Sequence, residues 1–215
     1  MTLGIVVMAK QPAPGRVKTR LAVTIGDTAA CAVYEALLWE TLRRARKTGF
    51  SVRISLDGPA DSPFATKLKA RDFVIEQQHN GDLGERLKHA LHAPTRLVAL
   101  GADCVVFDPA WIRAAASAPE PAMVGPTDDG GYWAVGGNFH NRALAPLLFD
   151  RMTWSVPTVF GATTARLQSA GIPMHQLPQC YDVDTEDDLQ RLLRDPRCSP
   201  QLRHELMRIS GPIAP

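Results

Sequence analysis

Short apolar runs alternate with segments of helical periodicity along the whole chain. The apolar runs have the length of buried strands, and they lie at residues 4–8, 51–56, 73–76, 96–100, 122–125, 132–136 and 172–177. Apolar positions three and four residues apart predict helices between them, at residues 27–48, 64–70, 83–92, 109–117, 158–170, 185–193 and 199–209. The TEDD sequence that opens the helix at 185–193 has the pattern of a capping box.

This alternation favours a mostly parallel sheet with helices on both faces, because parallel strands need long crossover connections. The strands lack polar alternation, which fits burial on both sides. Ligands of such open sheets bind beyond the carboxyl ends of the strands. Candidate chemistry is therefore expected in the loops at residues 9–20, 77–82, 101–108, 126–131 and 178–184.

Composition and charge narrow the classes of partner. The 215 residues carry a formal net charge of +2, which is too small to indicate nucleic acid or an anionic membrane as the partner. No apolar stretch approaches the roughly 18 residues of a membrane-spanning helix. The short apolar run at the N-terminus lacks the basic flank of a signal peptide, so we expect a cytoplasmic protein. The cysteines show no metal-like spacing and are expected to be free thiols, at Cys31, Cys104, Cys180 and Cys198.

The first loop concentrates positive charge that the net charge hides. The sequence AKQPAPGRVKTRLA, residues 9–22, contains four cations and no carboxylate. Its spacing matches neither a P-loop nor a dinucleotide-binding fingerprint. A turn that follows a strand and leads to cations is nevertheless a common way to hold phosphate. Lys10, Lys18 and Arg20 are thus candidates for binding a polyphosphate, and a solvated basic loop is the alternative.

Two acidic loops are candidates for holding a metal ion. Asp103 lies just past the strand at 96–100, where a carboxylate is well placed to hold Mg²⁺ or Mn²⁺ against phosphate oxygens, or else to cap a turn. In YDVDTEDDL, residues 181–189, Asp182 and Asp184 alternate. In an extended chain they point to opposite sides, so one is expected at the site while the other caps the following helix. Arginines of the C-terminal helices, Arg191 among them, are expected on solvated faces.

Two glycine turns complete the set of candidate loops. GPTDDGGYW, residues 125–133, places two glycines behind two aspartates, a pattern that allows close backbone approach to a ligand but also suits a hairpin turn. NGDLGERL, residues 80–87, brings Arg86 to a helix start. Trp133 and Cys104 are expected to be packing residues, although Trp133 has the best position of the tryptophans to meet an acceptor.

The five motifs AKQPAPGRVKTRLA, GDLGERL, GADC, GPTDDGGYW and YDVDTEDDL, in this order, resemble a bacterial family of glycosyltransferase-like proteins. That family is similar to the guanylyltransferases of deazaflavin-cofactor biosynthesis and belongs to the nucleotide-diphospho-sugar transferases. The resemblance covers about residues 3–193. It implies the glycosyltransferase-A fold: a single three-layer α/β/α domain over residues 1–215 with a mixed, mostly parallel sheet of about seven strands, and residues 195–215 as a C-terminal helical extension.

The resemblance also implies roles for individual residues. Lys10, Lys18 and Arg20, around Gly15, match a phosphate-contacting loop. The loop near the base and ribose corresponds to Asp82, Leu83, Gly84 and Arg86. Asp103 and Asp184 match the ligands of Mg²⁺ or Mn²⁺, with Asp182 as the alternative to Asp184, and Asp129 is expected to line the acceptor pocket. The chain departs from the family pattern G-[ST]-D-x-P-x-L at Ala102 and Val105.

The implied reaction is nucleotidyl transfer. A phosphate or carboxylate on a small acceptor attacks the α-phosphorus of a nucleoside triphosphate and pyrophosphate leaves, with Lys18 and Arg20 stabilising the leaving group. The first alternative is glycosyl transfer from a nucleotide sugar, with Asp129 or Asp128 as the base. The second is a nucleotide-binding protein without catalysis.

Overall fold

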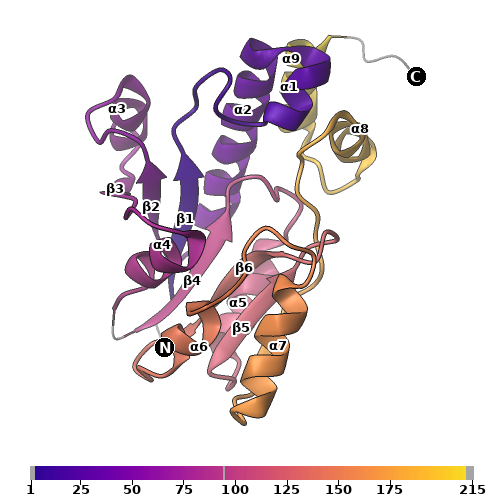
Figure 1. Cartoon of the computed structure of the whole chain (residues 1–215). Helices are drawn as coiled ribbons and strands as arrows, with labels where there is room; N and C mark the ends of the chain where they lie inside the picture. Colours follow the sequence, from indigo (N-terminus) through magenta and orange to yellow (C-terminus); the bar gives the residue numbers. More distant parts are fainter. Residues whose placement is uncertain (1–2, 94, 212–215) are drawn as a thin grey trace.

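The computed structural model describes residues 3–93 and 95–211, so the ends of the predicted domain range, residues 1–2 and 212–215, lie outside the described residues. The chain forms three layers, with a central sheet between two sets of helices (Figure 1). The strands are β1 (Leu3–Lys10), β2 (Ser51–Asp57), β3 (Val74–Gln77), β4 (Arg96–Gly101), β5 (Ala122–Pro126), β6 (Tyr132–Asn138) and β7 (Met174–Gln176). The helices are α1 (Thr19–Ile25), α2 (Asp27–Arg46), α3 (Pro63–Lys69), α4 (Leu83–Ala90), α5 (Pro109–Ser117), α6 (Leu144–Phe149), α7 (Val159–Ser169), α8 (Glu186–Arg194) and α9 (Pro200–Ser210).

The strand order across the sheet is β3-β2-β1-β4-β6-β5-β7. Neighbouring strands are parallel except where β6 pairs antiparallel with β4 and with β5. Within the described residues the sheet therefore has seven strands and is mixed but mostly parallel, which confirms the predicted fold class. Because β6 runs in the opposite direction, it starts at the edge where the other strands end. The five candidate loops consequently lie at one edge of the sheet, as predicted.

The apolar residues of the strands pack on both faces. On one face, residues of β1, β2 and β4 form a cluster with α2, α5 and α9. On the other face, residues of β1, β4, β5 and β6 pack against α4, α6 and α7. Since both faces are covered, the strands need apolar residues in succession, and this explains why their runs are continuous in the sequence.

Most predicted elements are present, and the differences have local causes. The basic loop ends in α1, a helix that the sequence did not predict, because it has only seven residues and only Leu21 among them is buried. Helix α6, which has six residues and contains a proline, was also not predicted. Strand β7 is shorter than residues 172–177. Asp27 lies in the first turn of α2 without capping it, because the N-cap is Gly26.

The C-terminal helices are fixed by caps and by core packing. Thr185 and Asp188 form a reciprocal capping box at the start of α8, as the TEDD pattern predicted. Helix α9 packs on α2, and its Leu202 and Leu206 join the main core. The residues after 195 up to Gly211 thus contribute to the same apolar cluster as β1. Among the described residues, no helix combines the length and the apolar composition needed to cross a membrane.

The connection between α8 and α9 contains a carboxylate that should make stability depend on pH. Asp195 accepts hydrogen bonds from Arg197 Nη2 at 2.7 Å and from the Tyr181 hydroxyl at 2.9 Å. The Arg197 bond, partly offset by burial, lowers the pKa of Asp195 from 3.8 to about 2. Replacing Asp195 with asparagine should therefore lower the free energy of unfolding at pH 7 by about 1–2 kcal/mol.

The sign of this effect follows from the lowered pKa. The stabilisation is complete above the ordinary pKa of 3.8 and is lost as pH falls toward about 2. Urea unfolding between pH 7 and pH 3 should show a constant difference between the two proteins above about pH 5 and a shrinking one below about pH 4. Glu205→Gln, at an exposed position of α9, is the matched control and should change little. A difference that stays the same at pH 3 would contradict this account.

Candidate functional site

Three adjoining cavities lie along the edge where the strands end. The outer cavity, of about 1000 Å³, is bordered by the end of β1 and the loop after β2. The central cavity, of about 450 Å³, lies between the basic loop, α4 and the loop after β4, and it shares Lys10 and Arg16 with the outer one. The acidic cavity, of about 190 Å³, shares Asp184 with the central one. Together they form one groove, which we call the edge groove.

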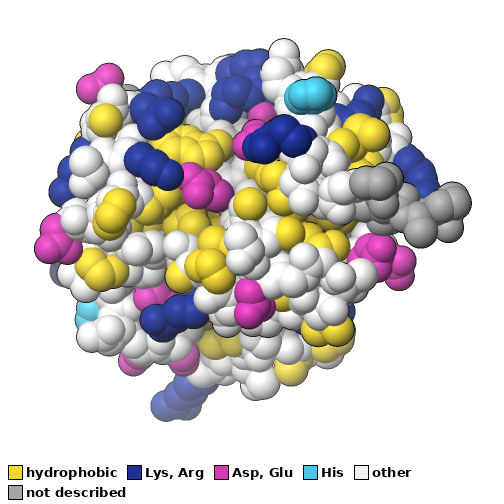
Figure 2. All heavy atoms as spheres, turned by 90° about the horizontal axis from the view of Figure 1, so that it is seen from above, with side chains coloured by type: hydrophobic (Ala, Val, Ile, Leu, Met, Phe, Trp, Pro, Cys, Tyr) yellow, Lys and Arg dark blue, Asp and Glu magenta, His cyan; other side chains and the backbone are white. Residues whose placement is uncertain are grey.

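Figure 2 shows this edge of the molecule from above. Lys and Arg side chains gather in the upper half of that view, and Asp and Glu side chains lie between them. The formal net charge of +2 does not reveal this local concentration of charged side chains. The local field of the edge groove is therefore set by a few cations and carboxylates, which the loops position as follows.

Tyr34 fixes the point at which the chain leaves β1. The Lys10 backbone N–H donates to the Tyr34 hydroxyl at 2.8 Å, and that hydroxyl donates to the Lys10 carbonyl at 3.1 Å. Tyr34 is buried in the middle of α2, and it lines the central cavity. Its residue type and helical spacing indicated only a core position, so sequence reasoning missed it.

Lys18 is the central residue of the site. Its φ of 49° and ψ of 42° are left-handed, a conformation that costs a lysine about 1 kcal/mol. Its carbonyl accepts a hydrogen bond from Ala22 N at 2.8 Å, which starts α1. Its Nζ donates to Asp103 Oδ2 and to Asp184 Oδ1, both at 2.6 Å, and its side chain is only 4% exposed. The predicted phosphate loop and the two predicted metal-binding loops therefore meet at this ammonium group.

The two carboxylates determine the charge state of Lys18. Burial alone lowers the pKa of a lysine, because it disfavours the charged form. Here Asp103 and Asp184 outweigh that effect, and the pKa of Lys18 is raised above its ordinary value. Lys18 is consequently a permanent cation at neutral pH.

The chemistry of Asp103 and Asp184 fits a divalent cation. Both side chains remain partly exposed, and their oxygen atoms converge on one point. Mg²⁺ in proteins is held by one or two carboxylates together with water and substrate phosphates. In the part of the chain that the structure describes, no group of three or more His, Cys, Asp or Glu side chains is arranged to hold a metal ion. The residues present thus suit an ion that is held partly by protein carboxylates and partly by oxygen atoms of a substrate.

Neither Asp182 nor Asp184 caps the following helix, contrary to the prediction. Both line the acidic cavity, because the capping role is taken by Thr185 and Asp188. The Asp184 backbone N–H also donates to Asp188 Oδ2 at 3.0 Å, which holds the turn before α8. Burial, followed by the neighbouring charge of Asp103, raises the pKa of Asp182 to about 8.

The remaining predicted cations face different cavities. Arg20 lines the acidic cavity, with Nη1 at 3.9 Å from Asp184 Oδ2 and a side chain that is 71% exposed. Lys10 and Arg16 are exposed and line both the outer and the central cavity. Arg16 was not among the predicted site residues, although it lies in the same basic loop.

Some residues at the start of α4 line the edge groove, and others serve to hold the fold. Leu83 and Arg86 line the central cavity, and Arg86 donates to the Gly81 carbonyl at 2.9 Å and to Gln78 Oε1 at 3.0 Å. Asp82 caps α4 through its side chain. At Gly84 a Cβ would lie 2.7 Å from the Phe149 carbonyl, so this glycine allows α4 to approach α6. Nucleotide contacts by Asp82, Gly84 and the exposed turn residue Gly15 stay predictions.

Asp129 shapes the turn between β5 and β6 and lines the acidic cavity. Its Oδ1 accepts hydrogen bonds from Thr127 Oγ1 at 2.6 Å and from Gly131 N at 3.0 Å. The turn also needs Gly130, since its φ of 85° is left-handed and a Cβ would lie 1.9 Å from the Pro157 carbonyl. The role of Asp129 toward an acceptor stays a prediction.

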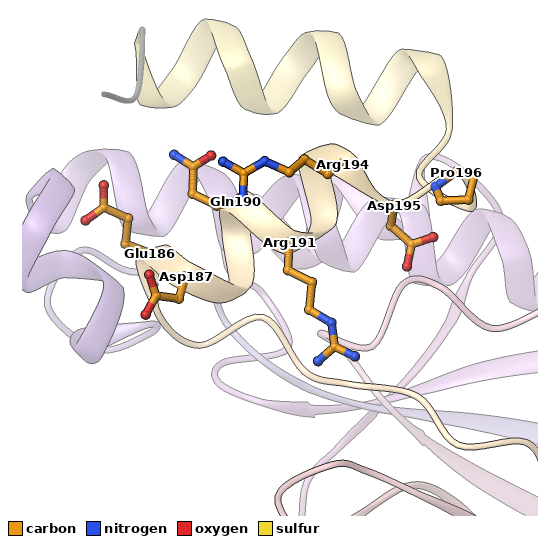
Figure 3. A pocket seen from close by; sticks show the side chains of 7 residues that line it. All are labelled: Glu186, Asp187, Gln190, Arg191, Arg194, Asp195 and Pro196. Atoms are coloured by element: carbon orange, nitrogen blue, oxygen red, sulfur yellow. The ribbon is translucent and has the colours of Figure 1, made fainter. Parts of the chain in front are cut away.

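Arg191 lies on an exposed face of α8, as predicted, but it also makes two specific contacts. Its Nη1 donates to Asp128 Oδ2 at 2.6 Å, and its guanidinium lies 3.7 Å from the centre of the Tyr181 ring. Figure 3 shows Arg191 leaving α8 on the side opposite to Gln190 and Arg194, and all three border a surface hollow at α8. Arg191 therefore connects α8 to the 127–131 turn and contributes a second cation to the acidic cavity.

The altered turn after β4 is held by the core. Ala102 and Val105 are buried, and the Ala102 carbonyl accepts a hydrogen bond from Thr41 Oγ1 at 3.2 Å. Cys104 is buried in the main core, which confirms its predicted packing role, and all four cysteines are free. The substitutions thus leave Asp103 in contact with Lys18.

Residues 41–156 match the model of a bacterial family described as "uncharacterized protein conserved in bacteria (DUF2064)". The chain belongs to this family. None of the curated proteins compared with it matches significantly. The predicted membership of a glycosyltransferase-like bacterial family is thereby confirmed.

Solved structures confirm the fold. A protein of Desulfovibrio desulfuricans, provisionally named a nucleotide-diphospho-sugar transferase, has a TM-score of 0.86 and 28% identity, with 97% of this chain and 95% of that one covered. The inositol-1-phosphate CTP transferase of T. maritima has a TM-score of 0.58 at 10% identity, over 98% and 97% of the two chains. Rv0371c of Mycobacterium tuberculosis has a TM-score of 0.53 at 23% identity, over 90% and 98%. This member of the family therefore has the fold of the nucleotide-diphospho-sugar transferases.

Proposed function

We propose that this protein is a nucleotide-using transferase that moves a nucleotidyl group from a nucleoside triphosphate to a small acceptor carrying a phosphate or a carboxylate. The observation that carries the proposal is the meeting of Lys18, Asp103 and Asp184 at 2.6 Å contacts, beside a cavity bordered by further cations. Such an arrangement of fixed charges suits a polyphosphate, whose negative charge increases on the leaving group as the bond breaks.

The names of the similar structures support a nucleotide donor. The same fold occurs in a CMP:2-keto-3-deoxy-manno-octonic acid synthetase solved with CTP, and in the T. maritima CTP transferase. Rv0371c has also been solved with manganese. These proteins place nucleotide and metal chemistry on this fold, and the edge groove offers the charges for both.

In the proposed reaction an acceptor oxygen forms a bond to the α-phosphorus while the bond to the β-phosphate oxygen breaks. Asp103 and Asp184 would hold Mg²⁺ or Mn²⁺, and the ion when bound supplies positive charge against phosphate oxygens. Lys18 and Arg20 stabilise the negative charge of the departing pyrophosphate. Lys10 and Arg16 attract the triphosphate to the groove and hold it, since both border two of the cavities.

Glycosyl transfer is the second candidate, and the acidic cavity favours it. Asp129 is exposed there, and one of its oxygens lies outside the bonds that hold its turn, so it is the better candidate for a base. Asp128, the other candidate, is engaged by Arg191 and by Gln179. A base at this position would take the proton of an acceptor hydroxyl.

The products of the reaction distinguish these proposals. The protein should be incubated with Mg²⁺, a pool of phosphorylated and carboxylated small acceptors, and each nucleoside triphosphate in turn. We expect acceptor-dependent release of pyrophosphate with at least one triphosphate. In a parallel incubation with nucleotide sugars and the same acceptors, release of a nucleoside diphosphate, without any pyrophosphate from triphosphates, would instead identify a glycosyltransferase. Nucleotide binding that is indifferent to Mg²⁺, with neither product formed, would contradict both and indicate a binding protein.

A further inference from the structure

The ammonium group of Lys18 fills the space between the two carboxylates that a metal ion would need. Its Nζ lies at 2.6 Å from Asp103 Oδ2 and at 2.6 Å from Asp184 Oδ1. A divalent ion bound by these oxygens would lie about 2.1 Å from each of them, close to the ammonium group, and would be repelled by its charge. Lysine and metal therefore compete for the same pair of oxygens.

Lys18 differs in this respect from the other cations of the groove. Arg20 approaches Asp184 only to 3.9 Å and is largely exposed, while Lys10 and Arg16 are exposed at the rim. A displaced cation that is only 4% exposed needs another negative partner, because an unpaired buried charge is strongly destabilising. The central cavity, which Lys18 also lines, offers the position for one in the form of a phosphate group.

We propose that Lys18 is a displaceable counter-ion that neutralises Asp103 and Asp184 in the empty protein and makes metal binding depend on the nucleotide. This inference rests on the proposed function, since it requires a metal and a phosphate in the edge groove. When the phosphates arrive, Lys18 moves its hydrogen bonds from the carboxylates to phosphate oxygens, and the freed carboxylates accept the metal. By thermodynamic linkage each ligand then increases the affinity for the other by the same factor.

The left-handed backbone of Lys18 supports this role. Lysine has no conformational preference for this region, and glycine would occupy it without strain. The residue stays there because its side chain is directed inward to the acids, whereas Arg16 and Arg20 of the same basic segment are exposed. Strain of this kind is stored where a contact over-determines the backbone, and such sites are often functional.

The test measures Mn²⁺ binding alone, without any nucleotide. Free Mn²⁺ can be followed by electron paramagnetic resonance during titration of the wild type, Lys18→Met and Lys88→Met. Lys88 is the matched control, because it pairs with Asp150 at the same 2.6 Å but outside the groove. Removing the competing cation should raise the affinity for Mn²⁺ by about tenfold or more. Lys88→Met should bind as weakly as the wild type, and Lys18→Met combined with Asp103→Asn should lose the gain.

Two further readouts keep the test decisive. Lys18→Gly removes the ammonium while keeping the left-handed backbone, and it replaces Lys18→Met if that variant folds poorly. Thermal unfolding should show that Mn²⁺ raises the Tm of the Lys18 variants more than that of the wild type. Equal Mn²⁺ affinity in the wild type and the variants would overturn the inference and leave the proposed reaction intact. Absence of Mn²⁺ binding in every variant would overturn the inference and also the assignment of Asp103 and Asp184 as metal ligands. The release of pyrophosphate would still decide whether the proposed reaction takes place.

Discussion

Replacing Asp103 with asparagine should lower the rate of nucleotidyl transfer by about 10²–10³-fold, the effect of removing one fixed charge or donor from a transition-state site. Asp103 contacts Lys18 and is one of the two carboxylates that would hold the metal. An amide keeps the shape of the side chain but lacks the negative charge that would hold the metal ion. The phosphate oxygens would then lose the positive charge that this ion supplies. The measurement is pyrophosphate release at saturating triphosphate, since the loss should appear mainly in kcat.

The control for this variant is Asp150→Asn, which removes a carboxylate paired with Lys88 at the same 2.6 Å distance outside the groove. It should keep wild-type activity. Loss of a partner for the buried Lys18 also lowers stability. Circular dichroism must therefore be used to check that Asp103→Asn is folded before its activity is compared. If activity stays within about threefold of the wild type in folded protein, Asp103 does not take part in the reaction.

The same assay separates Asp184 from Asp182. Asp184 contacts both Lys18 and, at longer range, Arg20, and it lines the central and the acidic cavity, whereas Asp182 lines the acidic cavity and not the central one. Asp184→Asn should therefore resemble Asp103→Asn, and Asp182→Asn should have a smaller effect. The opposite order would identify Asp182 as the partner of Asp103.

Structural features that depend on residues close together in the sequence could be predicted from it, and features that depend on distant residues could not. Buried parallel strands are apolar at successive positions, so their runs and the loops that follow them were visible locally. The capping box of α8 was visible for the same reason, because its two partners are three residues apart. Helix α1 was missed because a helix that buries one residue leaves almost no periodic signal.

The geometry of the site depends on contacts that are distant in the sequence. Lys18 is separated from Asp103 by 85 positions and from Asp184 by 166, and no local pattern indicates that their side chains meet. The sequence identified the three residues as polar groups at one sheet edge, but not that lysine lies between the acids. Alternation along the chain also did not predict the roles of Asp182 and Asp184, since residues 181–184 are irregular rather than a regular strand.

Replacing Trp133 with alanine should lower the free energy of unfolding by about 3–5 kcal/mol, the cost of removing a buried aromatic side chain. Trp133 is 2% exposed, so it is a packing residue as predicted and does not reach an acceptor. Its ring stacks on Phe107 at 5.2 Å, and its Nε1 donates to the Pro178 carbonyl at 3.0 Å. Urea unfolding monitored by far-ultraviolet circular dichroism measures the change directly.

Phe107 follows Asp103 in one acidic loop and Pro178 precedes Asp182 in the other, so Trp133 holds both loops against the start of β6. When Trp133→Ala is added to the Lys18→Met variant, it should thus weaken Mn²⁺ binding. It should also lower the stability of the protein. Trp133→Phe is the matched control, because it keeps the ring and removes mainly the donor to Pro178, at a cost of about 1–2 kcal/mol. A loss below about 1 kcal/mol for Trp133→Ala would mean that the two loops are held together by other contacts.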